Sequence, residues 1–487
     1  MIMPDRYNVD FTLRCRRSGI GPAGVSLLGA LLSWASAASA LQFDVKQISD
    51  DAIVSREPTI GNSSLIAWVS AYTNEIAGGA TRVTIFDHGQ RRDLENPEGG
   101  QNSAKPQAFS NSLVWIASFA NTPGDLTVRL KEVPWRDEGG MTELRALYSS
   151  VADSNGVVSM VAAPTGEQFS AVFVTNSQGM IETTNIVEKI DVTNEVRRHP
   201  RGDSEILYWT GGGGAGTGNT SRLTRDGRAD LAPSIWNEQV SWQKEKGWPF
   251  GWEIFFWKDG VSKQLTTNFY YDMAPKVQGR LVVWYGWDGH DFEIFMYDNE
   301  KDITSQITSN RYDDVAPVIW NGDVAWEGYE STAADIFLYH TVSNSPAGPV
   351  KGITNISKGN PDDDINPRIW DGKVVWQSFD GDDFEIYYYD GQKTYKLTSN
   401  NYDDVNPDIR DGLVVWQGYK DNWDAEIFAW EISSGFTKDA EGNTVAKDVI
   451  QITDNNVEDR DPRTSNHHIV WQQDETGKSR IMLATPK

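Results

Sequence analysis

The chain has 487 residues, and 44 lysines and arginines against 69 aspartates and glutamates give a formal net charge of −25 at pH 7. This acidic balance excludes nucleic acid or an anionic membrane surface as the main partner, because both require a basic face. The single cysteine excludes a disulfide scaffold, a cysteine-rich zinc site and a redox pair. The 20 tryptophans and 17 tyrosines favour β-strands over helices.

The N-terminus has the layout of a secretory signal peptide. Arg16 and Arg17 precede an apolar run over residues 20–34, and Ala38-Ser39-Ala40 matches a cleavage site. The run is short for a membrane span, although an uncleaved membrane anchor is the alternative. The pattern therefore predicts removal of residues 1–40 and export to the periplasm or the extracellular space, with no integral membrane segment left in the mature chain.

The C-terminal part of the chain, residues 220–487, is an internal repeat. Each of six units carries D-x-x-P followed by an apolar strand that ends in tryptophan, as in DVAPVIWNGDVAWE (314–327) and DVNPDIRDGLVVWQ (404–417). The anchor prolines are Pro233, Pro275, Pro317, Pro367, Pro407 and Pro462. A period of about 40–45 residues is typical of β-propeller blades. The longest spacings indicate insertions, one of them over residues 433–447.

Each unit is predicted to contain four short strands. These are an outer strand of the Gln264-Leu265-Thr266 type, the D-x-x-P strand, the V-V-W strand behind an Asp-Gly turn, and an acid–Ile–aromatic strand such as Glu293-Ile294-Phe295. Helical periodicity is almost absent. The sequence therefore predicts an all-β fold, a β-propeller with about six clear and up to four degenerate blades.

Residues 41–219 repeat more weakly and are predicted to form divergent blades. Pro58 and Pro106 anchor two units, residues 157–173 suggest a third, and Glu205–Trp209 is read as the inner strand of a fourth. Two closures are open. The outer-strand pattern at 45–49 can complete one large ring, whereas the pattern at 222–224 can complete a separate six-bladed ring.

These repeats resemble the TolB-type, WD-like β-propellers of exported bacterial and archaeal proteins. The matching features are the Thr-rich outer strand, D-x-x-P, the Asp-Gly turn, V-V-W and the acid–Ile–aromatic strand, over residues 220–487 and more loosely over 43–210. The resemblance implies binding of proteins or glycans, mostly without catalysis. The α/β domain that precedes the propeller in TolB itself is absent here, so that protein's role in the envelope does not carry over.

The D-x-x-P aspartates occupy equivalent positions, and two roles are open for them. If their strands line the channel, the six carboxylates ring one mouth and attract a cation or a basic partner. Alternatively each one accepts a hydrogen bond from a nearby backbone N–H and fixes its turn, which the sequence favours because every unit carries one. The residues are Asp230, Asp272, Asp314, Asp364, Asp404 and Asp459.

Acidic loops precede the acid–Ile–aromatic strand at residues 288–291 and 380–383, and Asp421 and Asp424 lie in the next unit. Calcium takes six to eight oxygen ligands, which such carboxylates can supply. The loops are shorter than an EF-hand loop and lack its terminal glutamate. The sequence favours solvated hairpin tips, and therefore no cofactor, with calcium as the alternative.

Aromatic residues crowd the same loops, and Trp252, Trp287 and Trp423 are the candidates for binding. Exposed aromatic rings beside carboxylates suit sugars, whose C–H faces pack on aromatic planes while their hydroxyls bond to acids. Packing between blades is the alternative.

One dense basic cluster, Arg197-Arg198-His199-Pro200-Arg201, stands out in this acidic chain. Arg198 and His199 could bind a carboxylate or sulfate of a polyanion, with Tyr208 as a partner in a lyase-type site. A surface loop between blades is the alternative.

The leading hypothesis is an exported, non-catalytic propeller that binds a protein or glycan through one face. The rival is a polysaccharide-active enzyme, most simply a lyase.

Overall fold

The computed structural model describes residues 41–487 with gaps, and for residues 119–203 it describes strand backbones without side chains. The gaps are 52, 63–64, 73–80, 98–99, 120–125, 129–132, 137–142, 148–149, 153–156, 164–167, 176–180, 190–202, 212–217, 226–227, 247–250, 346–347, 360, 421–423, 441 and 477. The predicted signal peptide lies outside the described residues. In the described part, no helix is long and apolar enough to cross a membrane.

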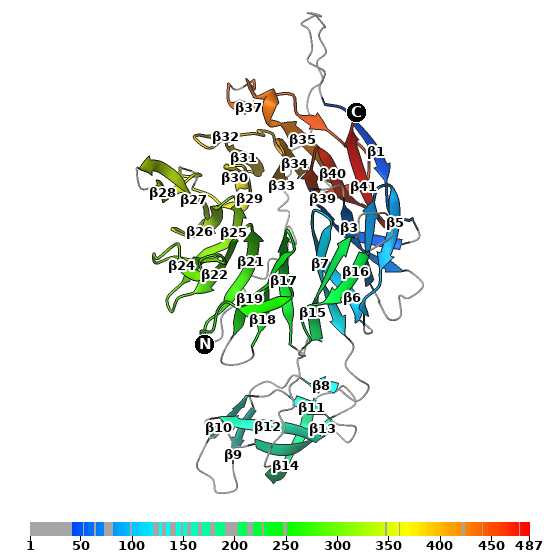
Figure 1. The fold of residues 1–487 in the computed structure, drawn as a ribbon, viewed down its shortest axis with the longest axis vertical. Coiled ribbons are helices and arrows are strands. Elements are labelled where there is room, and N and C mark those ends of the chain that lie inside the picture. The colour runs from blue at the N-terminus through cyan, green and yellow to red at the C-terminus, as the bar shows by residue number, and fades with distance from the viewer. Residues whose placement is uncertain are drawn as a thin grey trace, which may run out of the picture. The chain divides into compact units, whose positions relative to one another are not determined.

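The fold is a β-propeller of antiparallel four-stranded units, here numbered as blades 1 to 8 from the innermost strand outward (Figure 1). Blade 1 contains β2 (Ile53–Ile60), β3 (Ile66–Tyr72), β4 (Thr81–Asp87) and β5 (Gln90–Leu94). Blade 2 contains β6 (Gly100–Phe109), β7 (Ser112–Phe119), β15 (Asp203–Gly211) and β16 (Gly218–Arg222). A single parallel contact, Thr81 with Asn102, joins these two blades into one sheet.

The six regular repeats correspond to blades 3 to 8. Blade 3 has β17 (Asp230–Trp236), β18 (Gln239–Glu245), β19 (Trp252–Lys258) and β20 (Val261–Gln264); blade 4 has β21 (Asp272–Gln278), β22 (Leu281–Trp287), β23 (Phe292–Asp298) and β24 (Ile303–Gln306). Blade 5 has β25 (Asp314–Trp320), β26 (Asp323–Gly328), β27 (Asp335–Ser345) and β28 (Gly348–Asn355); blade 6 has β29 (Asp364–Trp370), β30 (Lys373–Phe379), β31 (Phe384–Tyr389) and β32 (Thr394–Lys396). Blade 7 has β33 (Asp404–Arg410), β34 (Leu413–Gly418), β35 (Glu426–Glu431) and β38 (Ile450–Gln451); blade 8 has β39 (Glu458–Ser465), β40 (His468–Glu475), β41 (Lys478–Pro486) and β1 (Phe43–Gln47).

The predicted insertion at residues 433–447 contains a short 3₁₀ turn (Ile432–Ser434) and a hairpin of β36 (Phe436–Lys438) and β37 (Thr444–Ala446).

The ring closes on itself through the N-terminal strand. β1 pairs with β41 from Phe43 opposite Pro486 to Gln47 opposite Met482, so it supplies the outer strand of the last blade. Each innermost strand contacts the next around the ring, and β39 of blade 8 contacts β2 of blade 1. The single-ring closure is therefore confirmed. The separate six-bladed ring is wrong, because β16 and the residues after it complete blade 2.

The stretch between β7 and β15 is an insertion in blade 2, and the strands described in it do not form four-stranded blades. It forms its own seven-stranded sheet of β8 (Leu126–Val128), β9 (Val133–Arg136), β10 (Glu143–Leu147), β11 (Ser150–Ala152), β12 (Val157–Ala163), β13 (Gln168–Thr175) and β14 (Ile181–Lys189). β15 pairs with β7 from Asp203 opposite Phe119 to Thr210 opposite Ser112. Glu205–Trp209 is therefore the third strand of blade 2, which corrects the expectation of an inner strand in a further unit.

A buried carboxylate holds each regular blade together. In blades 3 to 8 the D-x-x-P aspartate is at most 2% exposed, and its Oδ1 accepts a hydrogen bond from the indole N–H of the V-V-W tryptophan on the next strand. The six distances lie between 2.6 and 3.0 Å. The six tryptophans that donate these bonds are fully buried, and they are Trp242, Trp284, Trp326, Trp376, Trp416 and Trp471.

The same carboxylate also ties neighbouring blades. In blade 5, Asp314 Oδ2 accepts from the amide of Asn310 at 2.6 Å, and the backbone N–H of Asn310 donates to Glu293 of blade 4 at 2.7 Å. The acids of the acid–Ile–aromatic strands are thus buried connectors. The junctions of blades 6 with 7 and 7 with 8 repeat this arrangement through Asn400 and Asn455.

A second link uses the residue before each anchor proline. This residue has a positive φ in all eight blades, at a bulge in the innermost strand, so its N–H leaves the ladder. In blade 7 the freed N–H of Asn406 donates to the Gln377 side chain of blade 6 at 3.0 Å. Gln472 accepts from Glu57 in the same way at 3.1 Å and so joins the last blade to the first.

We expect Asp404→Ala to lower the free energy of unfolding by about 3 kcal/mol, because it leaves the buried indole N–H of Trp416 without an acceptor and also removes the hydrogen bond from Asn400. Denaturant unfolding measures this loss. Asp382→Ala is the control, since Asp382 is exposed at a hairpin tip, and we expect a change within about 0.5 kcal/mol. Equal losses in the two variants would contradict the structural role of Asp404.

The buried carboxylates also predict how stability depends on pH. Burial raises the pKa of Glu253 to about 7 and that of Asp272, its neighbour in blade 4, to about 6. A raised pKa means that the folded state binds the proton more tightly, so this stability is fully present below the unfolded pKa of about 4 and is lost as pH rises through 6 to 7. We therefore expect a higher melting temperature at pH 5 than at pH 8 in calorimetry.

The variant Glu253→Gln should show a smaller decrease in melting temperature between pH 5 and pH 8, because the amide is neutral without binding a proton. Below about pH 4 the trend reverses, since hydrogen bonds and nearby cations hold the pKa of Asp298 and Asp380 below the usual range. A melting temperature that stays constant from pH 5 to pH 8 would show that the paired carboxylates do not titrate in this window.

Candidate functional site

The six D-x-x-P aspartates do not face the channel. Their strands line it, but the carboxylates point into the blades and bond to tryptophan and asparagine side chains rather than to the backbone N–H groups expected from the sequence. All six carboxylates are therefore held within the blades through Oδ1, and a ring of carboxylates at the channel mouth has no counterpart in the described residues.

The central channel is a cavity of about 500 Å³ lined by all eight innermost strands. The residue after each anchor proline faces it and forms a middle layer. Three of these residues are cations, Lys276, Arg368 and Arg463, and one is an acid, Asp408. Within the described residues, no carboxylate lies within 4 Å of any of the three cations. An acidic protein therefore carries a locally basic channel.

Burial and the nearby positive charges lower the pKa of two of these cations, Lys276 and Arg368. Burial, with Arg368 nearby, lowers the pKa of Lys276 to about 8. Burial, with Arg463 as the largest charge contribution, lowers the pKa of Arg368 to about 10. The guanidinium groups of Arg368 and Arg463 donate to the carbonyls of Pro367 and Pro462, the residues that directly precede them. Like charges that are not neutralised in a low-dielectric space favour an anionic ligand.

The two ends of the channel differ. At the end where the innermost strands finish, the Arg410 guanidinium lies 4.5 Å from the ring centre of Trp320 and 6.0 Å from that of Trp236. The two indoles pack edge to face at 5.7 Å. At the other end, where the D-x-x-P strands begin, the lining residues are Glu57, Lys105 and Asp461. We call this end the D-x-x-P face.

An exposed aromatic run lies on the D-x-x-P face. Phe269, Tyr270 and Tyr271 directly precede β21 and are 65%, 42% and 45% exposed. Trp252 begins β19 and Trp287 ends β22 at the same face, and both are half-buried. Of the predicted binding tryptophans, these two thus lie beside exposed aromatic side chains, while Trp423 is outside the described residues. We call these five residues the aromatic patch.

Of the three residues of the predicted lyase-type site, only Tyr208 lies among the described residues. Tyr208 is 6% exposed, packs against Trp257 and shares a hydrogen bond of 3.3 Å with Ser112 in the core between blades 2 and 3. Arg198 and His199 lie outside the described residues. A catalytic tyrosine must reach the substrate, and the buried position of Tyr208 prevents that.

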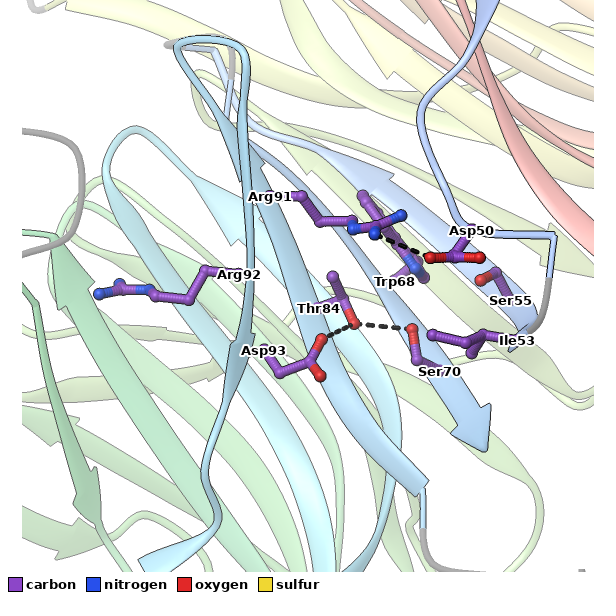
Figure 2. Close-up of a pocket in the computed structure, with 9 residues that line it drawn as sticks. All are labelled: Asp50, Ile53, Ser55, Trp68, Ser70, Thr84, Arg91, Arg92 and Asp93. Carbon is purple, nitrogen blue, oxygen red and sulfur yellow. Dashed lines mark hydrogen bonds and ion pairs between the residues drawn. The ribbon is translucent and has the colours of Figure 1, made fainter. Parts of the chain in front are cut away.

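A small polar pocket of about 150 Å³ lies in blade 1 (Figure 2). Here Ser55 stands where the regular blades have aspartate, and the Ser55 hydroxyl and the Trp68 indole N–H are buried without a hydrogen-bond partner. Thr84 links Ser70 at 2.6 Å with Asp93 at 2.7 Å, and Arg91 pairs with Asp50 at 3.0 Å. The pocket is therefore the space that a missing carboxylate leaves, and its size suits water.

No family model matches the sequence, and neither does any curated protein. Among solved structures, the chain is similar to a prolyl endopeptidase at 10% identity and a TM-score of 0.43, over 87% of this chain and 55% of that one. It is also similar to the β-propeller domain of the trilobed protease from Pyrococcus furiosus, at 12% identity and a TM-score of 0.30, over 82% of this chain and 98% of that domain. A putative TolB from Agrobacterium tumefaciens matches at 13% identity and a TM-score of 0.32, over 55% and 95%. The chain spans slightly more than half of the prolyl endopeptidase.

The lowered pKa of Lys276 predicts unusual reactivity. At pH 8 about half of its amine is neutral, so a small amine-directed reagent such as trinitrobenzenesulfonate should modify it early, as located by peptide mass spectrometry. Lys263 is the internal comparison, since hydrogen bonds to Asp302 and Tyr297 raise its pKa. Modification of Lys263 before Lys276 would contradict the electrostatics derived for the channel.

Proposed function

We propose that this protein is an exported, non-catalytic binding protein whose D-x-x-P face takes up a carboxylate-bearing glycan. The observation that carries the proposal is the middle layer of the channel, where Lys276, Arg368 and Arg463 lie without a carboxylate within 4 Å among the described residues. Arginine binds carboxylates through two parallel N–H donors, which suits uronate groups of an acidic polysaccharide.

The aromatic patch favours a glycan over a protein as the partner. Phe269, Tyr270 and Tyr271 present flat apolar surface to solvent, and sugar rings pack on such surfaces through their C–H faces. Asp288 and Asp291 lie on the loop after Trp287 and can accept hydrogen bonds from hydroxyl groups. Export supports an encounter with cell-surface or environmental polymers, and it rests on the layout of residues 1–40.

Calorimetric titration with a hexamer of galacturonate tests the proposal. We expect binding that weakens with salt, and at least a tenfold loss of affinity in Arg368→Gln and Arg463→Gln. Lys258→Gln, on the exposed end of β19, is the matched control and should bind normally. A neutral hexasaccharide of glucose should bind more weakly than the uronate.

Three results would overturn parts of this assignment. Binding of a poly-glutamate peptide without binding of the uronate would make the partner a protein. Equal binding by the wild type and both arginine variants would exclude the channel as the binding site. New ultraviolet absorbance from unsaturated uronate products would make the protein a lyase.

A further inference from the structure

Two loops on the D-x-x-P face have nearly the same sequence and gather three carboxylates each. Asp288, Asp291 and Glu293 meet between β22 and β23 in blade 4, and their oxygens lie within 4.8 Å of one another. Asp380, Asp383 and Glu385 meet in the same way between β30 and β31 in blade 6. We call these the blade 4 cluster and the blade 6 cluster. Their acidic character alone is common for hairpin loops, so the difference between them matters.

The blade 4 cluster contains buried oxygens that have no donor. Asp291 is 7% exposed and Glu293 is fully buried, yet Asp291 Oδ1 and Glu293 Oε2 accept no hydrogen bond. The other oxygens are held by backbone N–H groups: Asp288 Oδ1 accepts from His290 at 2.8 Å, and Glu293 Oε1 accepts from Asn310 at 2.7 Å. Glu385 Oε2 of the blade 6 cluster also accepts no hydrogen bond, so the unbonded oxygen that is specific to blade 4 is Asp291 Oδ1. The blade 4 loop thus fixes the carboxylates and leaves this buried oxygen available to a cation.

The blade 4 cluster has no fixed cation of its own. Among the described residues, no lysine or arginine lies within 4 Å of its carboxylates. The nearest basic side chain is the imidazole of His290, whose Nδ1 lies 3.6 Å from Asp288 Oδ1 and whose side chain is 89% exposed.

The blade 6 cluster has its own cation. Lys396 Nζ lies 2.8 Å from Asp380 Oδ2 and 3.4 Å from Glu385 Oε1. Lys396 pairs with Tyr387 on β31, and the equivalent position in blade 4, opposite Phe295 on β23, is Gln306. The two clusters therefore differ in their nearest cation: among the described residues, a lysine lies within 4 Å of the blade 6 carboxylates, and no lysine or arginine lies within 4 Å of the blade 4 carboxylates.

We propose that Asp288, Asp291 and Glu293 bind a calcium ion. The donor set consists of hard oxygen ligands, which calcium prefers at about 2.3–2.6 Å. Two ligands on opposite sides of an ion at about 2.4 Å are about 4.8 Å apart, and the three oxygens all lie within 4.8 Å of one another, so one ion can contact all three. Backbone carbonyls and water complete the coordination. The ion supplies in blade 4 the positive charge that Lys396 supplies in blade 6.

Thermal unfolding of the full chain after treatment with EGTA tests this site, with calcium chloride as the titrant and magnesium chloride as the ionic control. A ligand that binds only the folded state raises the melting temperature as its concentration increases. We expect this rise in the wild type, together with one calcium ion bound per chain in calorimetric titration.

Three variants locate the ion. Asp291→Asn removes a ligand, and Gln306→Lys installs the blade 6 lysine at an exposed position, so both should lose the calcium response. The lysine variant should keep or exceed the melting temperature of the chelated wild type, which guards against a result caused by misfolding. Asp383→Asn alters the blade 6 cluster and should leave the calcium response unchanged.

The proposal fails if calcium does not raise the melting temperature of the wild type beyond the magnesium control. It also fails if Gln306→Lys responds to calcium as strongly as the wild type does. Loss of the response in Asp383→Asn with its retention in Gln306→Lys would place the ion in blade 6 instead.

Discussion

The hydrogen bond from a tryptophan indole to a buried aspartate is the interaction on which the regular blades depend. It joins the innermost strand to the next one. In blades 5, 7 and 8 the second oxygen of the same carboxylate is linked through an asparagine to the preceding blade. A buried carboxylate costs free energy unless its oxygens are bonded, and here bonding and partial protonation both reduce that cost. The space is also tight, since a Cβ at Gly286 or Gly418 would collide with the aspartate of the paired strand.

The two N-terminal blades show what happens when this carboxylate is absent. In blade 2, Ser103 takes the aspartate position and Asn96 accepts the indole N–H of Trp115 at 3.2 Å, so a substitute acceptor is present. In blade 1, Ser55 takes the aspartate position without a substitute acceptor, and the Trp68 indole N–H makes no hydrogen bond beside a small pocket. The ring nevertheless closes, because closure uses different contacts: the pairing of β1 with β41 and the bond of Gln472 to the bulged Glu57.

Much of the fold could be predicted from the sequence because constant residues define it. D-x-x-P, the V-V-W tryptophan and an outer-strand threonine or serine recur in each regular unit. The hydroxyl of the latter accepts the N–H of the acid-strand isoleucine, as in the 2.8 Å bond from Ile294 to Thr308 and the 2.9 Å bond from Ile336 to Ser357. Blade 2 was misread because spacing cannot distinguish missing repeats from an insertion. The 127 residues from Pro106 to Pro233 equal about three periods, but they contain the rest of one blade and a separate sheet.

The candidate site was harder to predict for the opposite reason. A search for repeats selects positions that stay the same, and those positions, such as Asp404 and Trp416, lie inside the blades. The residue after the anchor proline varies from serine to lysine, valine, arginine and aspartate, so no motif marks it, although it faces the channel in every blade. Gln306 in blade 4 and Lys396 in blade 6 also occupy equivalent positions, and no motif marks the difference between them. In a protein built of repeats, a residue that is the same in every repeat stabilises the blade. A residue that differs between repeats at a solvent-facing position is not needed for that purpose and can bind a ligand.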